Sequence, residues 1–254
     1  MPPIFPHEIE ETILDSLAED DRGHSALKMC SLVCQAFLRI CRKHIFGNIV
    51  LHAVRGYSTT HAFECLLRET PEIADYIRNL EFRIQDEDLT NPSIQESLKR
   101  ISKVEFLTVR SAYCWNFEWR NTPIRPALLH LLHLPTLTHF ALLGTKNFVV
   151  SDLIPCVNLK YLEISDITTA ADETTFPAVF SEHSIQLNEF VVGEGDVDPI
   201  IMKLCTARRP DGQPIINFRS LPKISVVFCN RNEETLQELF SRCPFLTNVH
   251  INCK

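Results

Sequence analysis

The chain has 254 residues, of which 45% are hydrophobic and 22% are charged, as in a globular protein of one large domain or two modest ones. Its net charge of -7 argues against a nucleic-acid partner, because binding through phosphates needs a basic field. The sequence has no signal-peptide pattern and no run of eighteen apolar residues. We therefore expect a cytoplasmic or nuclear protein without a membrane segment.

Residues 1–50 predict a small domain of three helices. A first helix is expected from about Pro6, since proline suits the first helical position. Its apolar residues form one stripe between acidic ones: Ile9, Ile13, Leu14 and Leu17. A second helix capped by Ser25 and a third around 37–43 follow. Forty residues cannot enclose this much apolar surface, so part of it should face a partner or the next domain.

Two short motifs in this domain have a recognisable order. The first contains Phe5, Pro6, Glu8 and Ile9, and the second contains Ser31, Leu32, Val33, Cys34, Ala36 and Phe37. Together they resemble an F-box, whose members typically read Leu-Pro-x-Glu-Ile/Leu at the start and Val-Cys-x-x-Trp near the end. Phe5 stands for the leucine and Phe37 for the tryptophan, and both replacements are bulky and apolar. The resemblance implies that the domain docks on a Skp-type adaptor and joins a cullin complex, a ubiquitin ligase. The residues expected to contact the adaptor are Phe5, Pro6, Glu8, Ile9, Ile13, Leu32, Val33, Cys34 and Phe37.

Residues 51–254 repeat a short pattern, apolar-x-x-apolar-x-apolar, between segments with helical spacing that are predicted as helices, among them 151–157 and 176–183. The seven matches start at Ile77, Val104, Leu137, Leu159, Leu187, Leu221 and Leu246. Their spacings of 22 to 34 residues suit leucine-rich repeats. The frame at Leu221 is ambiguous, because Ile224 also fits as its first apolar position. The expected fold is thus α+β or α/β: the three-helix domain followed by an irregular solenoid of strand-turn-helix units.

A doubly wound nucleotide-binding fold is the main alternative for this second part. It is disfavoured because the predicted strands alternate apolar and polar residues, whereas strands covered on both faces are apolar throughout. No glycine-rich phosphate loop follows any strand, and the chain has only 7 glycines. We therefore favour the repeat solenoid.

Taken together, the two parts resemble the irregular F-box and leucine-rich-repeat proteins that are numerous in mushroom-forming fungi. That resemblance implies a substrate receptor that holds an unknown target protein for ubiquitylation. Two alternatives stay open: a repeat scaffold whose first domain is only a helical cap, and an α/β enzyme without a recognisable motif. No catalytic motif is present, so we predict a protein that is not an enzyme.

The polar and aromatic positions within the predicted strands should lie on the concave face, where solenoids usually bind their partners. These positions are Glu81, Arg83, Phe106, Thr108, Arg110, His139, Tyr161, Glu163, Glu189, His250 and Asn252. Arg83 and Arg110 occupy the same place in neighbouring units, about one strand spacing of roughly 5 Å apart. Such a pair either holds an acidic or phosphorylated target, or is solvated and balanced by Glu81.

Both tryptophans, Trp115 and Trp119, lie in a segment with aromatic residues at alternate positions. They are candidate target contacts, although rings also pack beneath long loops. The 10 cysteines lie mostly in apolar runs and are interpreted as buried residues of a reducing compartment. The series Cys30, Cys34, Cys41 and His44 overlaps an apolar helix face, so no metal and no cofactor is predicted.

Overall fold

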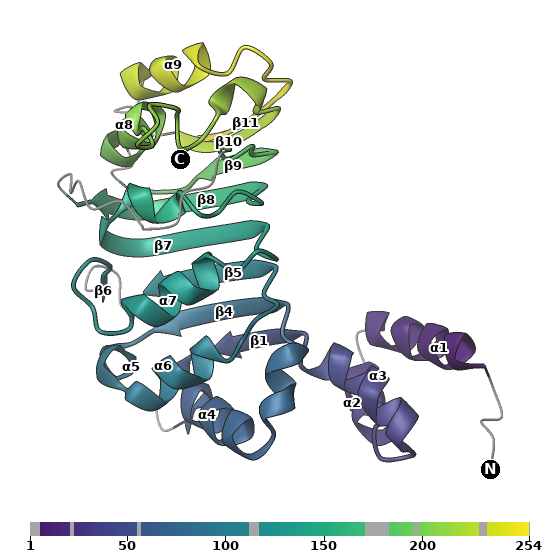
Figure 1. The fold of residues 1–254 in the computed structure, drawn as a ribbon. Coiled ribbons are helices and arrows are strands. Elements are labelled where there is room, and N and C mark those ends of the chain that lie inside the picture. Colours follow the sequence, from purple (N-terminus) through teal and green to yellow (C-terminus); the bar gives the residue numbers. More distant parts are fainter. Residues whose placement is uncertain are drawn as a thin grey trace.

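The computed structural model describes residues 6–20, 23–54, 57–111, 117–170, 183–195, 198–228 and 233–253. It contains a small helical domain beside a long sheet (Figure 1). The helices of the small domain are α1 His7–Glu19, α2 Gly23–Cys30 and α3 Gln35–Ile45. Their common core consists of Leu14, Leu27, Ile40 and Cys41.

Helix α2 begins at Gly23, two residues before the predicted cap at Ser25. Gly23 is needed there because a Cβ atom at this position would lie 1.7 Å from the carbonyl oxygen of Leu17. The glycine thus allows the start of α2 to approach the backbone of α1 closely.

The larger part is organised around one parallel sheet with the strand order β1-β4-β5-β7-β8-β9-β10-β11. Their bounds are β1 Asn48–Leu51, β4 Asn79–Ile84, β5 Phe106–Ser111, β7 His139–Phe148, β8 Tyr161–Thr169, β9 Glu189–Val192, β10 Lys223–Phe228 and β11 Asn248–Cys253. The short β6 Phe117–Glu118 pairs with β7, and β2 Ala53–Val54 pairs with β3 Tyr57–Ser58 in a separate hairpin.

Each of the seven apolar patterns found in the sequence forms a strand of this sheet. In β4 the side chains of Leu80, Phe82 and Ile84 are buried while those between them are half-exposed, which is the alternation expected of a sheet covered on one face. The ambiguous frame is resolved as well, because Leu221, Ile224 and Val226 are all buried. The first strand, β1, was not predicted.

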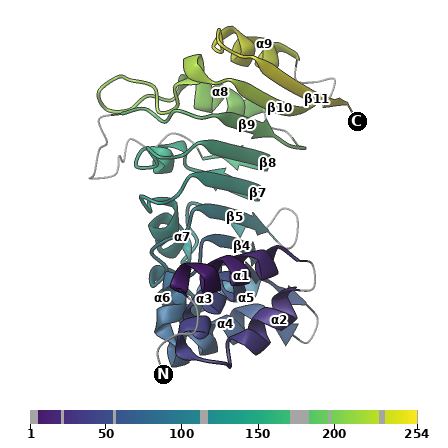
Figure 2. The same ribbon diagram turned by 90° about the vertical axis from the view of Figure 1, so that its right-hand side faces the viewer.

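Helices lie along one face of the sheet (Figures 1 and 2). They are α4 Thr59–Glu69, α5 Asp86–Thr90, α6 Pro92–Lys99, α7 Arg125–Leu132, α8 Asp198–Thr206 and α9 Glu233–Ser241, together with the 3-10 helices η1 Pro71–Asp75, η2 Val150–Leu153 and η3 Phe218–Ser220. Residues 151–157 were predicted as a helix, but the only helical structure there is the 3-10 turn η2. The helix predicted over 176–183 falls almost wholly on residues outside the described ranges. The apolar core lies between the helices and the sheet, and we call the opposite side of the sheet the open face.

The helical domain is attached at the β1 end of the sheet, as Figure 1 shows. The carbonyl oxygen of Gly47 accepts hydrogen bonds from the backbone N–H groups of Arg78 and Asn79, both at 2.9 Å. Across the same junction, Arg42 of α3 forms an ion pair with Glu72 of η1 at 3.2 Å. These contacts join the end of α3 directly to the first repeat unit.

Candidate functional site

The strands of the open face are in register, so their side chains form rows that cross the sheet. The row nearest the strand starts contains Asn48, Asn79, Phe106, His139, Tyr161, Glu189, Lys223 and Asn248. The next row contains Val50, Glu81, Thr108, Ala141, Glu163, Val191, Ser225 and His250. Most of the positions proposed for target binding therefore lie in two adjacent rows.

Three rings stack along the centre of the first row, and we call them the aromatic row: Phe106, His139 and Tyr161. The ring centroids of Phe106 and His139 are 4.0 Å apart with an interplanar angle of 20°, and those of His139 and Tyr161 are 5.5 Å apart with an angle of 28°. Phe106 is 41% exposed. The row thus offers a ribbon of ring surface that none of the described helices covers, suited to contact with an apolar or aromatic side chain.

Burial shifts the pKa values of two rings of the aromatic row, His139 and Tyr161. Burial lowers the pKa of His139, and this effect outweighs the carboxylates of Glu189 and Glu105, which raise it. The Tyr161 hydroxyl donates to Glu163 Oε2 at 2.9 Å. Burial first, and then this carboxylate, raise the pKa of Tyr161. Both rings are consequently neutral near pH 7, so the aromatic row carries no charge of its own.

Arg83 and Arg110 are register partners on β4 and β5, as the repeat spacing predicted. Glu81 Oε1 accepts from Arg83 Nε at 2.7 Å and from Arg110 Nη1 at 3.4 Å. The two guanidinium groups are therefore balanced in part by one carboxylate, and this corner of the open face keeps an excess of positive charge.

Trp119 does not fit the prediction that it contacts a target. Its side chain is fully buried, and its indole N–H donates to Asp152 Oδ2 at 2.7 Å. The ring also packs edge-on against Phe117 and Phe148. Pairing of β6 with β7 directs it into the core, which the alternation of aromatic residues alone did not reveal. Trp115 lies outside the described residues, and His250 is exposed on β11.

The residues predicted to contact an adaptor lie mainly on the surface of the helical domain. Ile9 is 46%, Ile13 55%, Leu32 80% and Val33 69% exposed. Pro6, Glu8 and Cys34 are also exposed, and Phe37 is half-buried against the core of the domain. Phe5 lies outside the described residues. The sequence reasoning missed Met29, which is 68% exposed and lies near the end of α2, shortly before Leu32 and Val33. We call Ile9, Ile13, Met29, Leu32 and Val33 the helical-domain surface.

Other kinds of site find little support in the described part of the chain. There, no three His, Cys, Asp or Glu side chains gather as metal ligands, and no helix is both long and apolar enough to cross a membrane. Several cysteines are buried: Cys41, Cys156, Cys205 and Cys243. Burial raises the pKa of the Cys205 thiol to about 11 and that of Cys243 to about 12, so neither is a thiolate nucleophile near neutral pH.

Comparison with models of known protein families finds no match. A search of curated proteins finds none either. Among solved structures, the chain is similar to internalin C2 from Listeria monocytogenes, with 14% sequence identity and a TM-score of 0.41 over 94% of this chain and 96% of that one. The functional assignment therefore depends on the surfaces described above.

Proposed function

We propose that this protein is the substrate-receptor subunit of a cullin-based ubiquitin ligase. In this proposal the helical domain is an F-box that binds a Skp-type adaptor. The leucine-rich-repeat-like units behind it hold a target protein on the open face. The protein contributes proximity and orientation, while the transfer of ubiquitin belongs to other subunits.

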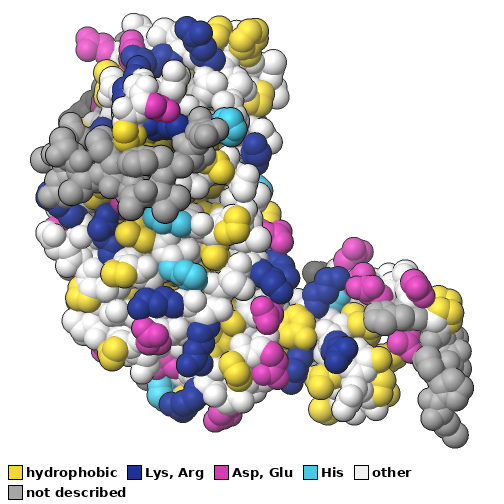
Figure 3. Space-filling model, viewed as in Figure 1, with side chains coloured by type: hydrophobic (Ala, Val, Ile, Leu, Met, Phe, Trp, Pro, Cys, Tyr) yellow, Lys and Arg dark blue, Asp and Glu magenta, His cyan; other side chains and the backbone are white. Residues whose placement is uncertain are grey.

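The observation that carries the proposal is the helical-domain surface. Among the described residues, five of the eleven exposed large hydrophobic side chains belong to this small domain, as Figure 3 shows in the hydrophobic patches at its surface. The domain already has a closed core, formed by Leu14, Leu27, Ile40 and Cys41. The exposed side chains are thus not part of the core that holds the domain together, and apolar surface of this kind marks an interaction site.

The side chains that belong to the sequence motifs are also among those that the structure leaves exposed to solvent. Ile9, Leu32 and Val33 belong to the two motifs that resemble an F-box, and each is strongly exposed. Burying one such side chain in an interface stabilises a complex by about 1.5–3 kcal/mol. Association itself costs about 4–15 kcal/mol, so these side chains would be the anchors of a larger interface with the adaptor.

The open face supports the second half of the proposal. Its aromatic row and the Arg83–Glu81–Arg110 cluster are not covered by any described helix, and they offer ring surface beside positive charge. Aromatic and arginine side chains are the residues most enriched at binding hot spots. A protein segment with apolar and acidic side chains fits this combination.

Co-purification with a Skp-type adaptor tests the proposal. The double variant Ile9→Asp/Val33→Asp should lose the adaptor, because each carboxylate would have to be desolvated in the interface. Its matched control is Ile251→Asp/Val249→Asp, which makes the same two changes at residues of β11 that are 49% and 48% exposed. Circular dichroism should show both variants folded. Retention of the adaptor by the first variant, or its loss from the control as well, would count against the proposed interface.

A further inference from the structure

A cavity of about 820 Å³ lies among the loops that lead into β10 and β11, far along the sheet from the helical domain. Its volume is in the range of small-molecule pockets. Three arginines line it, Arg208, Arg219 and Arg242, and no aspartate or glutamate is among its lining residues. In a chain with a net charge of -7, such a concentration of cations requires an explanation.

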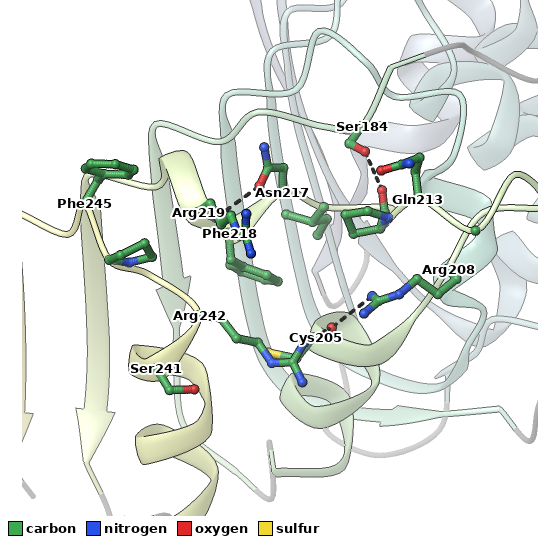
Figure 4. Close-up of a pocket in the computed structure, with 14 residues that line it drawn as sticks. Ser184, Cys205, Arg208, Gln213, Asn217, Phe218, Arg219, Ser241, Arg242 and Phe245 are labelled. Carbon is green, nitrogen blue, oxygen red and sulfur yellow. Dashed lines mark hydrogen bonds between the residues drawn. The ribbon is translucent and has the colours of Figure 1, made fainter.

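Two of the guanidinium groups converge on one backbone atom. Arg208 Nη1 and Arg242 Nη1 donate to the carbonyl oxygen of Cys205 at 3.4 and 2.9 Å, and Figure 4 shows both groups reaching it from the cavity walls. Arg242 also forms an ion pair with Glu238. The Arg208 side chain donates only to backbone carbonyl oxygens among the described residues, at Cys205 and Ala207. No acidic side chain in the described part of the chain forms an ion pair with Arg208.

The third arginine is presented by a fixed turn. Asn217 Oδ1 accepts from the Arg219 backbone N–H at 3.2 Å, and buried Phe218 anchors η3 by an edge-on contact with Phe190 at 5.6 Å. The Arg219 side chain is exposed at the cavity. In the connection between α9 and β11, Phe245 is 71% exposed. The cavity thus combines guanidinium donors with an uncovered ring (Figure 4).

We propose that this cavity binds an oxyanion group, a carboxylate or a phosphate, carried by a ligand whose flat apolar part lies against Phe245. A guanidinium group offers several N–H donors in one plane and pairs with both kinds of oxyanion. Since Arg208 has no acidic partner among the described residues, the ligand would supply a negative charge there without displacing an ion pair seen in the structure. The site uses none of the residues of the open face or the helical-domain surface, so it is independent of the proposed function.

Isothermal titration calorimetry of the full chain with phenyl phosphate, inorganic phosphate and benzoate tests the proposal. Phenyl phosphate or benzoate should bind, and the stronger of the two identifies the anionic group. The variant Arg208→Gln/Arg219→Gln should weaken binding by about tenfold or more, through loss of charge-assisted hydrogen bonds. The control Arg39→Gln/Arg68→Gln removes the same charge from exposed helical positions and should bind as the unmodified protein does.

The apolar part of the site has its own test. Phe245→Ala should weaken the binding of phenyl phosphate or benzoate while leaving that of inorganic phosphate unchanged. The proposal is overturned if neither aromatic anion binds at concentrations up to about 10 mM, a limit that corresponds to a negligible affinity. It is equally overturned if the double arginine variant binds with unreduced affinity while thermal unfolding shows it to be folded.

Discussion

Arg83 and Arg110 lie side by side on β4 and β5 and share one acceptor, Glu81 Oε1, at 2.7 and 3.4 Å. The side chains of both arginines are more than 40% exposed, so water screens their mutual repulsion and their attraction to the carboxylate. This arrangement therefore lowers the stability of the fold little, and part of each guanidinium group is accessible to solvent. It has the properties of a binding surface and contributes little to holding the strands together.

Replacing Glu81 tests whether this cluster is dispensable for folding. We expect Glu81→Gln to change the free energy of unfolding by less than about 1 kcal/mol, as for other exposed ion pairs. Urea denaturation followed by circular dichroism measures it. A loss of several kcal/mol would show that the cluster is structural, and would remove it from the proposed target-binding surface.

The contact between Trp119 and Asp152, unlike the ion pairs of Glu81, should contribute strongly to the free energy of unfolding. Asp152 accepts from the Trp119 indole at 2.7 Å and from Arg125 Nη2 at 2.8 and 2.9 Å. Asp152→Ala leaves both donors without this acceptor in a buried setting, so it should lower the free energy of unfolding by about 3–5 kcal/mol.

Asp75→Ala is the control for that measurement. Asp75 pairs with Lys103 at 3.4 Å, and its side chain is 60% exposed. Its loss should cost no more than about 1 kcal/mol. Equal effects of the two substitutions would contradict the structural role assigned to Asp152.

The strands were the most predictable part of this fold. Their buried positions, such as Leu80 and Phe82, alternate with polar ones because only one face of the sheet is covered, and that alternation is visible in the sequence. Strand β1 escaped prediction because only Leu51 of its four residues is buried. The segment with Pro155 was predicted as a helix, yet it forms only a single 3-10 turn before the proline.

The candidate surfaces were predictable in part. Spacing alone placed Arg83 opposite Arg110, because equal positions in successive units become register partners. It did not reveal that Glu81 bridges them, since this depends on side-chain conformations. Alternating aromatic residues made Trp119 a candidate target contact, but only the pairing of β6 with β7 shows that it faces the core.

The pH dependence of stability should report on His139. Its pKa in the folded chain is lowered from the ordinary value of 6.5 by burial, so the unfolded chain binds this proton more readily. The free energy of unfolding is therefore unaffected by this group above pH 6.5. It decreases as the pH falls from 6.5 through the lower pKa of the folded chain.

The variant His139→Phe keeps a ring in the aromatic row and removes the titration. Its free energy of unfolding should fall less steeply than that of the unmodified protein between about pH 6.5 and 5. Urea denaturation at several pH values gives both slopes. Identical slopes would show that His139 is not perturbed by its place between Phe106 and Tyr161.

Adaptor binding is the central claim, and the mass of the complex in solution tests it most directly. Purified protein and a purified Skp-type adaptor, mixed at micromolar concentrations and analysed by light scattering after size exclusion, should elute as one species with the mass of a one-to-one complex. The Ile9→Asp/Val33→Asp variant should elute apart from the adaptor. Separate elution of the unmodified protein and the adaptor would contradict the proposed ligase function.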